Sequence, residues 1–120
     1  MHYTVIEYAN KKIVEVISSD PPLRTEQDAV DVIAANFEHD TTLLLLHYHA
    51  LDADFFQLRT RVAGSMIQKW INYHLKTAAI IPQDLVNQGR FQEMVLEMNK
   101  RNSQFRVFNS REDATNWLAS

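Results

Sequence analysis

The chain carries four consecutive leucines, Leu43 to Leu46, with no polar residue among them. A short unbroken apolar run is typical of a strand that is covered on both faces. Polar residues follow at once, and a second helical pattern begins near residue 54. The run therefore predicts a central strand of an α/β sheet. Candidate functional residues then lie just past its carboxyl end, where ligands usually bind in open sheets of this class.

Alternating strand and helix patterns occupy the rest of the chain and predict the order β-β-α-β-α-β-α-β-α. Strands alternating with helices imply crossover connections and a mostly parallel sheet, to which the first hairpin adds one antiparallel strand. The prediction is a single α/β domain over residues 1–120, with a mixed five-stranded sheet and four helices. The helices are expected at residues 25–40, 54–73, 87–102 and 110–118. The residues expected to cap them are, in the same order, Thr25, Asp54 with Gln57, Asn87, and Ser110 with Asp113.

Composition narrows the classes of function. The chain has no Cys, which excludes disulfides, Cys nucleophiles and thiolate metal sites. Two glycines leave no room for a glycine-rich phosphate loop, and no apolar segment has the length of a membrane helix. A net charge of −3 argues against nucleic-acid or membrane partners. We therefore expect a cytoplasmic protein.

Several blocks of sequence, spread over nearly the whole chain, resemble a family of small bacterial proteins of unknown function with a STAS-like fold. These proteins are distantly similar to anti-anti-sigma-factor domains. The resemblance implies a mixed five-stranded sheet surrounded by helices and no assigned activity. The blocks are residues 12–17, His47, residues 54–60 and 63–73, Asn99 with Lys100, and residues 112–118.

The resemblance also singles out Thr60. Anti-anti-sigma-factor domains use a Ser or Thr near the start of their second helix as a phosphorylation switch, and residues 58–64 are the matching stretch here. Arg61 stands where that family usually has a small residue, and the typical Asp-Ser-Ser/Thr-Gly signature is missing. Thr60 is thus a candidate phosphorylation site and, alternatively, an ordinary helical threonine.

His47 and His49 alternate at strand spacing and would point to one side of an extended strand. With Asp52 and Asp54 they offer the ligand types that zinc accepts. Alternatively, one imidazole bonds a strand end and the other is solvated. We predict no metal, no cofactor and no catalytic residue.

Arg59, Arg61 and Lys69 form either a basic patch for an acidic partner or a solvated helix face. Gly64, between Ala63 and Ser65, predicts close packing of the helix on the sheet, with an open groove as the alternative.

We predict a non-enzymatic protein-interaction or regulatory module that binds an unknown protein partner. The alternative is a small-molecule or lipid pocket between the second helix and the sheet, lined by Phe56, Met66 and Trp70. A homodimer through an exposed sheet edge is a further expectation. The interaction surface is expected at His47, His49, Asp54, Arg59, Thr60 and Arg61.

Overall fold

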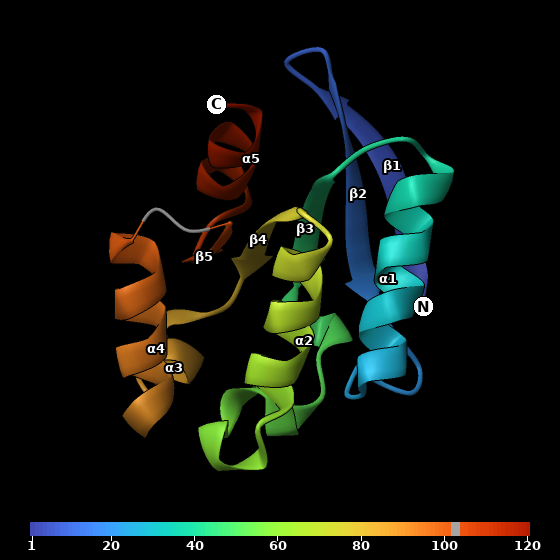
Figure 1. Cartoon of the computed structure of the whole chain (residues 1–120). Coiled ribbons are helices and arrows are strands. Elements are labelled where there is room, and N and C mark those ends of the chain that lie inside the picture. Colours follow the sequence, from blue (N-terminus) through green and yellow to red (C-terminus); the bar gives the residue numbers. More distant parts are fainter. Residues whose placement is uncertain (102–103) are drawn as a thin grey trace.

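The computed structural model describes residues 1–101 and 104–120, which form one twisted five-stranded sheet with helices on both faces (Figure 1). The strands lie in the order β1-β2-β3-β4-β5. β1 is antiparallel to β2, and the remaining neighbours are parallel, so the predicted mixed five-stranded sheet is confirmed. The strands are β1 His2–Tyr8, β2 Lys11–Ser18, β3 Leu43–His47, β4 Lys76–Ile80 and β5 Phe105–Phe108.

The leucine run forms the central strand, β3, as predicted. β3 pairs with β2 on one side and with β4 on the other. Leu44, Leu45 and Leu46 are fully buried. Because successive side chains of a strand point to opposite faces, these leucines contribute to both faces of the sheet.

The two faces are covered very differently. Leu44 and Leu46 face the side that carries most of the helices, here called the broad face. Leu45 faces the opposite side, here called the α5 face, which carries the single helix α5 (Arg111–Ala119). Twenty-five of the described residues form the buried apolar cluster of the broad face, and five form that of the α5 face. The helices of the broad face are α1 Glu26–Glu38, α2 Val62–Asn72, α3 Gln83–Val86 and α4 Gly89–Lys100; the other is α5 Arg111–Ala119.

The predicted second helix over residues 54–73 begins eight residues too early. The structure has two 3₁₀ turns there, Ala53–Phe56 and Leu58–Thr60, and α2 starts at Val62. The hydroxyl of Thr60 lies 2.7 Å from the carbonyl oxygens of both Asp54 and Gln57, and this side-chain bonding competes with the helical pattern. Arg61 then takes a left-handed conformation, with φ of 65°, which separates the turns from the helix.

Two capping predictions are wrong, for different reasons. Asp54 does not form a capping box with Gln57; its own amide donates to the Asp52 carboxylate. Asn87 does not cap α4, because its side-chain oxygen accepts from the Gln83 side chain at 2.8 Å. The residues before Asn87 form the short helix α3, so the described residues hold five helices rather than the predicted four. Asn102, at the predicted end of the third helix, lies outside the described residues.

The other two caps are confirmed. The Thr25 hydroxyl accepts from the Asp28 amide, and the Asp28 carboxylate accepts from the Thr25 amide. The Ser110 hydroxyl accepts from the Asp113 amide and starts α5.

Candidate functional site

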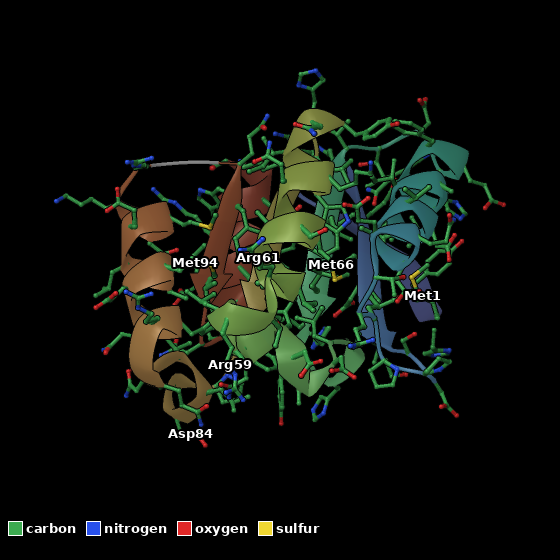
Figure 2. The ribbon with its side chains drawn as sticks, turned by 60° about the horizontal axis from the view of Figure 1, so that its bottom comes forward. Met1, Arg59, Arg61, Met66, Asp84 and Met94 are labelled. Atoms are coloured by element: carbon green, nitrogen blue, oxygen red, sulfur yellow. The ribbon has the colours of Figure 1, made fainter. Side chains whose placement is uncertain are left out.

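A shallow groove of about 680 Å³ follows the outer side of α2. Its lining residues on α2 recur at spacings of three and four, so they share one helical face. Figure 2 shows Met94 extending from α4 toward α2, with Arg61 beside α2 on the side that faces α4. We call this hollow the α2 groove; it is lined by Glu26, Leu58, Arg61, Gly64, Ser65, Gln68, Lys69, Asn72 and Met94.

Gly64 borders open space in this groove. A Cβ atom built on Gly64 would meet no atom within 4 Å beyond its own helix. The prediction that Gly64 allows close packing of the helix on the sheet is therefore wrong. The packing surface of α2 is instead its opposite side, where Ala63, Met66 and Ile67 are buried.

Among the described charged residues that line the groove and the hollow beside it, cations outnumber anions. Arg61 and Lys69 lie in the groove, and Arg59 and Arg90 line an adjoining hollow of about 280 Å³ that shares Leu58. Glu26 is the one acidic residue among the described residues that line the two hollows. In a chain with net charge −3, this is a local reversal of sign.

Thr60 lies next to the groove with its hydroxyl already bonded. The Thr60 hydroxyl oxygen lies close to the carbonyl oxygens of Asp54 and Gln57, and it also accepts a hydrogen bond from the Val62 amide at 3.3 Å. A phosphate on Thr60 would remove the hydroxyl donor and break this turn. Phosphorylation of Thr60 stays a prediction.

His47 lies on the other side of the sheet, in a cluster with Glu15 of β2 and Arg111 of α5. The Glu15 side chain is 8% exposed. Arg111 donates to both of its oxygens, at 2.8 and 3.0 Å, and His47 Nε2 lies 2.6 Å from Oε2. Because an ionised carboxylate only accepts hydrogen bonds, Nε2 carries the proton in this contact.

The charges of this cluster set the protonation of Glu15. The Arg111 guanidinium, hydrogen-bonded to the carboxylate, holds the pKa of Glu15 below its ordinary value of 4.5. Burial acts in the opposite direction, and the bond from His47 lowers the pKa further. Reciprocally, the bond to Glu15 raises the pKa of Arg111. The cluster therefore holds a buried carboxylate in its charged form.

A family model described as a domain of unknown function, DUF4180, matches residues 8–118. The chain belongs to the DUF4180 family. The match contains every residue of the α2 groove and of the Glu15 cluster. No curated protein and no solved structure matches this DUF4180 chain.

The predicted interaction surface is therefore divided in the DUF4180 chain. Arg59, Thr60 and Arg61 lie together at the start of α2, whereas the His47 side chain is on the α5 face. His49 lies in a 3₁₀ turn after the strand has ended, and its ring packs on Tyr48 with centroids 4.0 Å apart. The two imidazoles thus do not share one face of a strand.

Asp54 lies at the edge of this region and is paired. Its carboxylate accepts from Arg24 Nε at 3.1 Å. Within residues 1–101 and 104–120, no three His, Asp or Glu side chains are placed to hold one metal ion.

The predicted pocket residues belong to the core of the broad face. Met66 and Trp70 are buried on the packing side of α2, and the Trp70 indole donates to the Ala29 carbonyl at 3.2 Å. Phe56 is also buried and stacks edge-on against Phe91, at the base of the smaller hollow. A ligand pocket between α2 and the sheet stays a prediction.

Glu15 and Arg111 are the site residues that sequence reasoning missed. A usable signal was present, since Glu15 interrupts the apolar run of residues 13–17 at the position of a buried strand. A buried carboxylate requires a partner, but the partner is 96 residues away in sequence.

None of the helices in the described part of the chain has the length and apolar content needed to cross a bilayer.

Proposed function

We propose that this protein is a non-enzymatic interaction module whose α2 groove binds an acidic segment of a partner protein. The observation that carries the proposal is the sign of the charge: among the described residues, four cationic residues and one acidic residue line the groove and its adjoining hollow, in a chain that is acidic as a whole. Such a local field attracts acidic segments and fixes their orientation. Leu58 and Met94 add apolar contact area, and methionine adapts readily to the shape of a partner.

The non-enzymatic part of the proposal rests on how candidate groups are bonded. His47 bonds Glu15, the Thr60 hydroxyl bonds the turn before α2, and the Ser65 hydroxyl donates to Glu26 at 3.1 Å. Each of these contacts holds the side chain against another part of the protein. No two of the three side chains bond each other, as a nucleophile and its base would.

We further infer that the fold is STAS-like and that the protein is a bacterial, cytoplasmic regulator. The support is the resemblance of the sequence blocks that include residues 54–60 and 63–73. A mixed sheet whose one antiparallel strand lies at the edge is compatible with that inference.

The test compares wild-type protein with the double variant Arg61→Glu/Lys69→Glu in quantitative affinity capture from cells that make the protein. Proteins enriched by the wild type are then purified and titrated into both forms by calorimetry. We expect at least a tenfold loss of affinity in the double variant. We also expect wild-type affinity to fall as salt is raised, because the contacts are between exposed charges.

Lys100→Glu/Arg101→Glu is the matched control, since it makes the same change of charge at the end of α4, at residues that do not line the groove. It should retain the partner. Equal binding by the wild type and the double variant, or binding that is insensitive to salt, would contradict the proposal.

A further inference from the structure

β1 is an outer strand with an unpaired edge. In the described part of the chain, it pairs with β2 alone. A two-residue turn closes the hairpin, with Ala9 at φ 52° and Asn10 at φ 65°, and Tyr8 lies opposite Lys11. Figure 1 shows this hairpin projecting beyond the helices. The edge is therefore accessible to another strand.

The turn determines which backbone groups face outward. In a hairpin of this type, the two residues that flank the turn exchange hydrogen bonds, and the pattern alternates from there. Tyr8, Ile6 and Thr4 therefore direct their amide and carbonyl groups to β2. Glu7, Val5 and Tyr3 direct theirs outward.

This edge has few of the features that usually block strand pairing, and Glu7 is its one Asp, Glu, Lys or Arg residue. β1 contains no Lys, Arg or Pro, and its one irregularity lies between His2 and Tyr3, which leaves residues 3–8 regular. Three of the six exposed large apolar side chains in the described residues lie at this strand, namely Met1 at 41%, Val5 at 36% and Tyr8 at 36%. An edge of this kind is suited to pairing.

We propose that β1 pairs antiparallel with β1 of a second copy of this chain, with Val5 of each copy facing the other across a two-fold axis. In this register Tyr3 lies opposite Glu7 of the second copy, and Thr4 lies opposite its Ile6. The outward groups of Tyr3, Val5 and Glu7 all meet partners, which gives about six backbone hydrogen bonds. The result is one continuous sheet across both copies.

The side chains favour this register and a second copy as the occupant. A pairing centred on Glu7 would place two carboxylates opposite each other, and one centred on Tyr3 would draw the irregularity at His2 into the ladder. The register centred on Val5 avoids both. Registers centred on Thr4 or Ile6 also avoid both, but they pair two outward residues of each copy within residues 3–8, against three for the register centred on Val5. The strand is then its own complement, as a two-fold interface requires. A single strand pair buries less surface than a standard interface, so the dimer is concentration-dependent.

A single cysteine tests the register directly, because the chain has none of its own. In Val5→Cys, the two new thiols face each other with Cα atoms about 5.5 Å apart, which is within disulfide range. Mild oxidation should convert most of the protein to a covalent dimer. In the control Glu7→Cys, on the same edge, the thiols lie four residues out of register, roughly 14 Å apart along the strand. That variant should crosslink at least tenfold more slowly.

Charge variants test the second copy as the occupant by sedimentation equilibrium. Val5→Lys and Val5→Asp alone should each weaken association at least tenfold, and mixing the two should restore a dimer, because residue 5 meets residue 5 only across the two-fold axis. Circular dichroism melting curves check that both variants fold. A wild type that stays monomeric at several hundred micromolar, equal crosslinking of Val5→Cys and Glu7→Cys, or failure of the mixture to pair would overturn the proposal. The interface is independent of the α2 groove.

Discussion

The two faces of the sheet are stabilised in different ways. On the broad face, four helices cover an extensive apolar cluster. On the α5 face, a nine-residue helix covers a small cluster and is held at both ends by charged groups. Arg111 bonds Glu15 at the start of α5, and Lys76 donates to the Trp117 carbonyl at 2.7 Å near its end.

This difference shows how a helix with little apolar contact is positioned. Lys76 also lies 4.7 Å from the centroid of the Trp117 ring, and burial there lowers its pKa. Burying charges costs free energy, so these pairs add less stability than apolar packing of equal area. Their geometry is directional, however, and we infer that they fix where α5 sits on the sheet. On the broad face, apolar packing of α2 on its inner side is extensive, and the α2 groove lies on its outer side.

The largest expected effect separates the two faces within one strand. Leu46 and Leu45 are adjacent and fully buried, but they face opposite sides of the sheet. We expect Leu46→Ala to cost about 4 kcal/mol and Leu45→Ala about 2–3 kcal/mol, because the cavity under a single helix collapses more easily. Urea denaturation of both variants measures the difference. A larger cost for Leu45→Ala would show that the α5 face is the more rigidly packed one.

An intermediate effect is expected at the charged end of α5. Arg111→Met leaves a buried carboxylate with His47 as its remaining side-chain partner, and we expect a loss of about 1–2 kcal/mol. This figure is below that for a fully buried pair because the Arg111 side chain is 52% exposed. Arg101→Met, which removes an exposed ion pair with Glu97, is the control and should cost under about 0.5 kcal/mol.

The pH dependence of this loss gives a second check. The pKa of Glu15 is lower in the folded protein than its ordinary value of 4.5. Its ionised form therefore stabilises the fold above that value, and the contribution is lost as the pH falls toward the folded pKa. The cost of Arg111→Met should be full near neutral pH and should shrink at about pH 3. A cost that does not change with pH would mean that Arg111 acts through packing alone.

The smallest effect is expected on the outer side of the broad face. Gly64→Ala should stabilise the protein by about 0.5–1 kcal/mol, because alanine favours the helix and its methyl group enters open space. Gly89→Ala is the matched control and should destabilise by about 1 kcal/mol, since φ at this residue is +50°. Thermal melts report both changes. Destabilisation by Gly64→Ala would mean that the groove is narrower in solution.

Particular residues show where sequence reasoning succeeded. Three predictions depend on residues close together in the chain, and each is confirmed. They are the tetraleucine strand, the mixed five-stranded sheet, and the caps at Thr25 and Ser110. The start of α2 was misplaced because Thr60 bonds carbonyls that a helix would otherwise use. The candidate site was predicted in part: Arg59, Thr60 and Arg61 lie together, but His47 is on the opposite face.

By itself, the sequence determined the alternation of elements and the central strand, because apolar periodicity and local capping act over a few residues. Only the tertiary structure decided the partners of Glu15, since charged pairs between distant elements follow from how those elements pack. The tertiary structure also decided that Gly64 faces open space. Whether a small residue fills a contact or leaves a groove depends on what the neighbouring helices cover, and spacing along one helix does not contain that information.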